Sequence, residues 1–498
     1  MDEFVSAAIG GVASIPPGKW TETLRAFTQA HEETWSLLPI CGYATKVHMV
    51  RAVLQLLRHT VGGDGRHRSR SLGLDVEAEA LLAARILLRE RRGAEMLMDE
   101  QALKFYMQAA QEDGDAYEGY RVSLMALKCL NNALWDQPTG QLSFVRLKGL
   151  EMVVNLLQDP RPASVLYFAC RIFNVVGTSN SAAFAPLKKE HDLLQTLSSI
   201  LAWCVRCEEP PFPRGEDRLK LMVQVLQGLF LLGVRYTQEE REIALTSDSM
   251  KRLGFVLVDA LHLDHAELDV LKAKLQVLNL LLDMPGGFAD VLFEYGCLPR
   301  ILQLVELQLV RQAFEEGVEM DPAAELTPAL LVLNKLTLAS EDIKKANKQA
   351  IFPPQADKAG YSHNYNLYIS HTSPHRWTST SHRITAWHIT SQQSAASKAW
   401  KAQLERERSS LMLLTGAERE QAEKAVKDRR VHPVDAPRGS LRARLFAIMT
   451  STESSSKAAT SDLLFNLCDN EEEFTTRCGF GNAVNTLRLK GRIIMPGV

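Results

Sequence analysis

The sequence predicts an all-α protein built as an armadillo- or HEAT-like right-handed helical solenoid. The main observation is a phrase that recurs inside apolar helical runs, an apolar residue followed by Asn or Gln. The first five copies lie 43, 53, 52 and 55 residues apart, the size of a repeat of two or three helices. Such repeats bury their apolar faces on one another and form a long concave surface. The six copies are Leu130-Asn131, Phe173-Asn174, Leu226-Gln227, Leu278-Asn279, Leu333-Asn334 and Phe465-Asn466.

Helical periodicity is the second observation, because apolar residues recur at steps of three and four. Proline- and glycine-rich breaks at 136–140, 208–213 and 284–287 end helices, and no paired strand patterns with alternating polarity occur. The predicted helices cover 21–38, 43–60, 74–92, 94–110, 118–135, 142–158, 163–177, 189–207, 216–235, 247–262, 267–283, 287–312 and 323–350.

Composition divides the chain into a solenoid over 1–352, an insertion over 353–437, further repeats over 438–492 and a tail over 493–498. Between 361 and 400 about a third of the residues are Ser or Thr, a composition that does not support a packed core. We therefore expect disorder there, followed by a charged, solvated helix near 398–430. The last repeats should contain two or three helices. A second loop, rich in Gly and Arg, is expected at 61–71.

The bulk properties indicate a cytoplasmic, monomeric protein without a transmembrane segment. Formal net charge is −2 in 498 residues, which predicts no general affinity for nucleic acid. No window of 18 uncharged apolar residues occurs, and the N-terminus lacks the basic segment of a signal peptide. The one CxxC, at 204–207, has no second pair to complete a zinc site and lies in a helical context.

No motif for covalent catalysis, a cofactor or a metal is complete. The segment around Gly18-Lys19 lacks the first glycine and the Ser or Thr of a phosphate-binding loop. Val484 replaces the last glycine of a dinucleotide fingerprint that begins at Gly479. Five histidines of the insertion lack metal-ligand spacing with an acidic partner. They are His363, His371, His375, His382 and His388. We expect a regulatory protein that reshapes a partner.

Several phrases resemble the synembryn family, also called resistance to inhibitors of cholinesterase. Their order spans about 75–350 and 438–492. The resemblance implies a helical solenoid that acts as a guanine nucleotide exchange factor and folding chaperone for G protein α subunits. The partner would be a GDP-bound or nucleotide-free α subunit, which could bring the protein to the cell cortex. The phrases are ARILLR (84–89), ALKCLNN (126–132), LYFACRIFNVV (166–176), VLNLLLDMP (277–285), the stretch 440–468 and GFGNA (479–483).

The resemblance also implies binding residues for the C-terminal helix of the α subunit. Arg85 and Arg89, four residues apart on one helix face, would pair with acidic groups or the terminal carboxylate, unless they belong to a solvated basic face. Asn132, with Asn131 beside it, would clamp peptide backbone or bond within the solenoid. Phe173 would pack on the captured helix or in the core. Arg171 and Asn174 on the same helix are further candidates.

Some features depart from the family pattern. The fourth repeat has Gln227-Gly228 in place of the usual Asn, and Asp283 stands where Asn is common. An acidic Ser/Thr segment after the last repeats is missing, which argues against phosphorylation control. The alternative is a generic armadillo adaptor for another peptide. An importin-like cargo groove would show a Trp-x-x-x-Asn ladder, which the seven tryptophans do not form.

Overall fold

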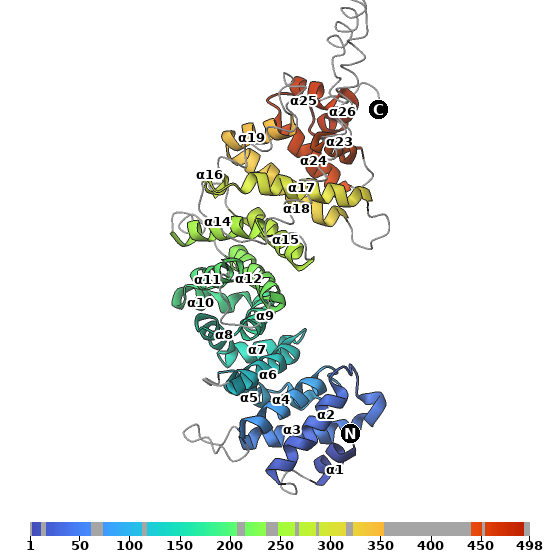
Figure 1. Cartoon of the computed structure of the whole chain (residues 1–498), viewed down its shortest axis with the longest axis vertical. Coiled ribbons are helices and arrows are strands. Elements are labelled where there is room, and N and C mark those ends of the chain that lie inside the picture. The colour runs from blue at the N-terminus through green and yellow to red at the C-terminus, as the bar shows by residue number, and fades with distance from the viewer. Residues whose placement is uncertain are drawn as a thin grey trace, which may run out of the picture. The chain divides into compact units, whose positions relative to one another are not determined.

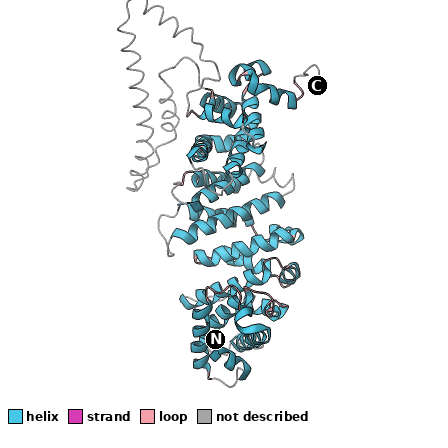
Figure 2. Cartoon of the chain, turned by 90° about the vertical axis from the view of Figure 1, so that its right-hand side faces the viewer, coloured by secondary structure: helices cyan, strands magenta, loops and turns pink. Residues whose placement is uncertain are grey.

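The computed structural model describes residues 2–10, 16–60, 73–111, 117–206, 215–235, 248–263, 268–284, 288–314, 322–352, 440–450 and 454–492. All regular elements in these ranges are helices, which confirms the predicted all-α class (Figure 2). The chain divides into two compact units, residues 1–283 and 284–498.

The first unit is built from two rows of helices (Figure 1). In each row a helix packs beside the next, and every first-row helix after α2 also packs on a helix of the second row. The first row contains α2 (Pro17–His31), α4 (Gly73–Leu88), α6 (Tyr117–Leu134), α9 (Ala163–Ser179), α12 (Gly215–Arg235) and α15 (Leu268–Asp283). The second row contains α3 (Leu38–Thr60), α5 (Glu100–Ala110), α7 (Pro138–Arg146), α8 (Gly149–Gln158), α11 (Leu193–Arg206) and α14 (Asp248–Leu261).

The core lies between and along these rows, where the apolar side chains of the first-row helices are buried. In α9 the buried residues recur at helical spacing, from Val165 to Val176. Tyr167, Arg171 and Asn174 are only partly buried, on the remaining side of the helix. The recurring phrase predicts repeats that bury their apolar faces against one another. The helices of the first unit pack in this way.

Several predicted helices are divided in the structure. The predicted helix 142–158 is split into α7 and α8 at Lys148, whose φ of 63° is left-handed. Gly149 follows it, and a Cβ there would lie 2.4 Å from the Phe144 ring, so the two short helices approach closely. The range 94–110 is likewise divided, with a short 3₁₀ helix η2 (Glu95–Leu97) before α5. Asp99 begins α5 by accepting a hydrogen bond from Ala102 N.

The predicted helix 189–207 is two helices, because His191 is extended between α10 (Phe184–Glu190) and α11. A short 3₁₀ helix η3 (Ser181–Ala183) precedes α10. The first helix, α1 (Asp2–Gly10), was not predicted. It is held by tertiary packing, since the Phe4 ring lies 6.4 Å from that of Trp20 and 4.8 Å from that of Phe27.

The second unit joins segments from both sides of the insertion. The predicted helices 287–312 and 323–350 are each divided, at Gly296 (φ 77°) and at the extended Ser340. Helix α24 packs lengthwise on α18, so a repeat after the insertion stacks on a repeat before it. The C-terminal stretch forms four helices rather than two or three. The helices are α16 (Ala289–Glu294), α17 (Cys297–Phe314), α18 (Pro322–Ala339), α19 (Glu341–Ile351), α23 (Leu441–Met449), α24 (Ser454–Leu467), α25 (Glu471–Cys478) and α26 (Phe480–Leu489).

Some sequence expectations lie outside the described residues: the loop at 61–71, the insertion with its charged helix and five histidines, and the tail at 493–498. Cys204 is buried in α11, whereas Cys207 lies outside the described part. In that part no helix is long and apolar enough to cross a membrane. The described residues also hold no group of three or more His, Cys, Asp or Glu placed to bind a metal.

Candidate functional site

The recurring Asn or Gln lies on the first-row helices of the first unit and on α18 and α24 of the second unit. Two of these amides bond across to a neighbouring helix. Asn174 Nδ2 donates to Gln224 O at 2.9 Å, and in the second unit Asn466 Nδ2 donates to Asn334 Oδ1 at 2.8 Å. On α6 the bond comes from the residue after the recurring Asn131, since Asn132 Nδ2 donates to Arg85 O at 3.4 Å. Asn132 therefore joins consecutive repeats, which corresponds to the structural role considered for it.

Asn131 and Asn174 each keep one acceptor without a partner. Asn131 is 8% exposed and its Nδ2 donates to Asn132 Oδ1 at 3.3 Å. The Oδ1 atoms of Asn131 and Asn174 are buried and accept no hydrogen bond from the described residues. A buried amide oxygen without a donor is energetically unfavourable.

The close approach of α12 to the helices on its two sides explains the departures from the family pattern at Gly228 and Asp283. A Cβ on Gly228 would lie 3.2 Å from Asn174 Oδ1, and a Cβ on Gly233 would lie 2.6 Å from Asp283 Oδ2. Both glycines are on α12, which has α9 and α15 on its two sides. Glycine at these positions leaves room for the polar side chains of both neighbouring helices.

The predicted helix 74–92 ends earlier, at Leu88 of α4, so Arg85 lies on α4 and Arg89 in the turn that follows it. The two arginines do not form a solvated basic face on one helix. Arg89 Nη1 donates to Thr34 O at 2.9 Å and to His31 O at 3.4 Å, so it caps the C-terminal end of α2. Burial, and after it the charge of Arg85, lower the pKa of Arg89 from its usual value. Arg85 Nη2 lies 3.8 Å from Glu32 Oε1, and its side chain is 15% exposed. The guanidinium of Arg89 is therefore used in hydrogen bonds that hold the end of α2. Among the described residues, the ion pair of Arg85 is the long contact with the exposed Glu32.

Phe173 lies in the core. It has no exposed surface, and its ring centroid is 5.1 Å from that of Phe184 on α10, at an interplanar angle of 67°. Of the two roles considered for Phe173, this placement leaves only the packing role open, because a partner cannot reach the ring without displacing its neighbours.

Arg171 is one of the partly exposed residues among those predicted to bind the partner. Its guanidinium carbon lies 5.2 Å from the ring centre of Trp135, and Nη1 donates to Tyr167 Oη at 3.0 Å. Lys128 Nζ lies 5.7 Å from the ring centre of Phe168. Trp135 is 51% exposed. No carboxylate of the described residues pairs with Arg171, so this cation rests on aromatic surface with most of its donors available.

We call these outward residues of α6, α9 and α12 the ladder face. Sequence reasoning missed its aromatic members. Trp135 and Phe230 stand one helical turn after the recurring Asn131 and Gln227, so these two were detectable by that spacing. The ladder face carries two cations, exposed aromatic rings and amides, and it includes no Asp or Glu. This chemistry suits an amphipathic segment that brings apolar side chains and a carboxylate. Its members are Lys128, Asn132, Trp135, Tyr167, Phe168, Arg171, Gln227 and the 40% exposed Phe230.

Comparisons with known proteins concern the family and the fold. A family model described as "Guanine nucleotide exchange factor synembryn" matches residues 80–362, which include α6, α9, α12 and the part of α4 from residue 80 on. No curated protein matches the chain. A crystal structure of an engineered protein from the Northeast Structural Genomics Consortium has a TM-score of 0.52 at 12% identity, over 98% of this chain and 94% of that one. At this identity the likeness supports the fold alone.

Proposed function

The chain belongs to the synembryn family of guanine nucleotide exchange factors, and we propose that it is an exchange factor and folding chaperone for heterotrimeric G protein α subunits. The observation that carries the proposed mode of binding is Arg171, a cation held on Trp135 and Tyr167 without a carboxylate partner among the described residues. The protein performs no bond chemistry, and it acts through the conformation of its partner.

In this proposal the ladder face takes the C-terminal helix of the α subunit. A chain terminus carries a carboxylate, whose two oxygens match the planar donors of a guanidinium. Arg171 uses one hydrogen bond within the chain, so it has donors left for that carboxylate. The rings of Trp135 and Phe230 offer apolar surface on either side of Arg171 along the row of helices.

Capture of that helix would release GDP because the helix then no longer supports the part of the α subunit that holds the guanine base. The ladder face favours the opened α subunit only by its difference in affinity between the open and closed states. A shift from 1:99 to 99:1 needs a difference of about 10⁴-fold, roughly 5.5 kcal/mol. The same preference for a nucleotide-free partner would support chaperoning of newly made α subunits in the cytoplasm and at the cell cortex.

The test compares two charge reversals in the uptake of a GTP analogue by purified α subunit. We expect Arg171→Glu to weaken binding of the nucleotide-free α subunit by at least tenfold, about 1.4 kcal/mol, because it replaces attraction of a carboxylate by repulsion. The matched control is Arg51→Glu, an exposed residue of α3 in the second row.

The outcomes separate the parts of the proposal. Faster analogue uptake that is lost when the last turns of the α subunit are deleted would support exchange through the ladder face. Tight binding without faster uptake would leave the chaperone role. Equal affinity of the two folded variants would refute the assignment of Arg171, and no binding by the unmodified chain would favour the adaptor alternative.

A further inference from the structure

The residues that border the insertion in the sequence meet in space. Phe352 follows the end of α19, and its ring is 3% exposed. The guanidinium carbons of Arg442 on α23 and Arg477 on α25 lie 5.4 Å and 5.2 Å from its centre. Arg442 Nη2 also donates to Arg477 O at 2.7 Å. The end of the segment before the insertion is therefore in contact with helices of the segment after it.

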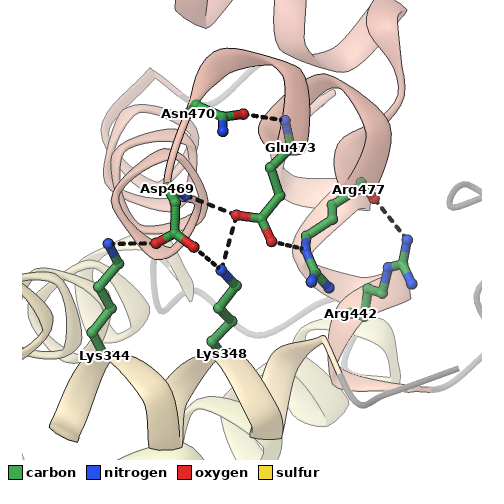
Figure 3. A network of polar contacts seen from close by, with 7 residues as sticks. All are labelled: Lys344, Lys348, Arg442, Asp469, Asn470, Glu473 and Arg477. Carbon is green, nitrogen blue, oxygen red and sulfur yellow. Dashed lines mark hydrogen bonds and ion pairs between the residues drawn. The ribbon is translucent and has the colours of Figure 1, made fainter. Parts of the chain in front are cut away.

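An ionic cluster lies beside this aromatic contact. Two of its cations are on α19 and one is on α25, and its acids are Asp469, between α24 and α25, and Glu473 on α25 (Figure 3). Lys348 Nζ is 2.8 Å from Asp469 Oδ2 and 2.8 Å from Glu473 Oε2. Lys344 Nζ is 3.0 Å from Asp469 Oδ1, and Arg477 Nε is 2.7 Å from Glu473 Oε1. Each of the two acids thus binds two cations.

Glu473 holds the cluster in one geometry because it also begins α25. Its backbone N–H donates to Asn470 Oδ1 at 2.8 Å, and its Oε2 accepts from Asp469 N at 2.8 Å. This reciprocal arrangement resembles a capping box. The carboxylate that meets Lys348 is consequently fixed before α19 docks, which lowers the entropy lost on forming the pair.

The contact extends along neighbouring helices of the same unit. Thr327 and Ser456 hydroxyls are 3.1 Å apart across α18 and α24, and Asn466 bonds to Asn334 between the same helices. Arg444 Nη1 on α23 donates to Glu306 O on α17 at 3.3 Å. All of these contacts join a residue before 353 to a residue after 439.

We propose that this cluster is a clasp that keeps α23–α26 docked on α17–α19 independently of the backbone between residues 352 and 440. The clasp consists of Lys344, Lys348, Phe352, Arg442, Asp469, Glu473 and Arg477. A cut within 353–439 would therefore leave the second unit assembled. The pair that contributes most is Lys348 with Glu473, because their side chains are 20% and 21% exposed, whereas Asp469 is 64% exposed and is screened by solvent.

The experiment places a specific protease recognition sequence within residues 380–400 of the full chain and cuts the folded protein. We expect the two fragments to elute together at micromolar concentration. Cutting the Lys348→Gln/Glu473→Gln variant should give a dissociation constant between fragments at least tenfold higher. Gln at position 473 retains the capping role, so the variant loses charge rather than the start of α25. Glu472→Gln, an exposed residue of the same helix, is the control.

A second measurement needs no variant. Raising NaCl from 0.05 to 0.5 M should raise the dissociation constant of the cut wild-type fragments several-fold, because ion pairs are screened while apolar contacts are not. Separation of the wild-type fragments at low salt would overturn the proposal. A cut double variant as tightly bound as the wild type, together with no effect of salt, would show that the cluster contributes nothing to the docking.

Discussion

Arg85 on α4 and Arg89 just after it should differ in what they stabilise, and the variants Arg89→Met and Arg85→Met separate the two effects. Arg89 makes one well-placed charge-assisted hydrogen bond to Thr34 O, at 2.9 Å, and a weaker one to His31 O, at 3.4 Å. Hydrogen bonds to charged groups contribute about 1.5–3 kcal/mol each, so losing this pair should cost about 2–3 kcal/mol. Arg85 has a 3.8 Å contact with the 57% exposed Glu32, worth about 0–1 kcal/mol.

The assay is thermal unfolding with hydrogen exchange of the backbone amides at the end of α2. A change of 1 kcal/mol lowers Tm by about 2–4 °C in domains of this size class, so Arg89→Met should lower it by roughly 4–12 °C. Arg85→Met should change it by less than about 4 °C. Faster exchange at residues 28–31 is expected for Arg89→Met alone. An equal loss of stability in both variants would refute the reasoning, and would also mean that charge reversal at Arg85 cannot report on partner binding.

Three further predictions concern packing, pH and thiol reactivity. Gly177→Ala should lower the free energy of unfolding by about 1–3 kcal/mol, because its Cβ would lie 2.3 Å from the buried ring of Phe184. Gly481→Ala should not destabilise the protein, because no atom lies within 4 Å of its Cβ. Chemical denaturation measures both changes. Hydrogen bonds from two lysines lower the pKa of Asp469 to about 2. The stability that this carboxylate contributes should therefore be complete above about pH 4, near its unfolded pKa, and be lost as pH falls toward 2. An acid titration followed by circular dichroism measures this loss of stability. The variant Asp469→Asn should lack the part of the loss that Asp469 causes. Burial raises the pKa of the Cys297 thiol to about 12, so iodoacetamide at pH 8 should label the partly exposed Cys41 at least tenfold faster, as mass spectrometry would show.

The sequence allowed the fold class to be predicted because the repeat has a local signature. Apolar spacing and a polar residue at a fixed place in each unit are properties of one helix at a time. Helix divisions were less predictable, since the break at Lys148 depends on a non-glycine residue in a left-handed conformation beside Gly149. Helix α1 is short and is held by the rings of Trp20 and Phe27, which only the folded chain brings together.

The helices of the candidate site could be predicted from the sequence, whereas the roles of its side chains could not. The order of the family-like phrases located α4, α6 and α9, but the role of each side chain depends on which helix lies opposite. Arg89 meets carbonyl groups that are 55 and 58 residues away in the sequence, and no spacing within α4 could show this. Phe173 follows the apolar period of α9, and that period alone does not tell a core ring from a binding ring.

The structure suggests a division of roles along α6 and α9. In α9 the recurring amide of Asn174 bonds to the neighbouring repeat, and in α6 Asn132, next to the recurring Asn131, does the same. One helical turn before Asn174 in α9 stands Arg171, which contacts the rings of Trp135 and Tyr167 and, among the described residues, no carboxylate. A cation that is held in place but not neutralised loses little entropy and little internal pairing when it meets an anionic partner. Substitution of the amide should therefore affect stability first, whereas substitution of Arg171 should affect binding first.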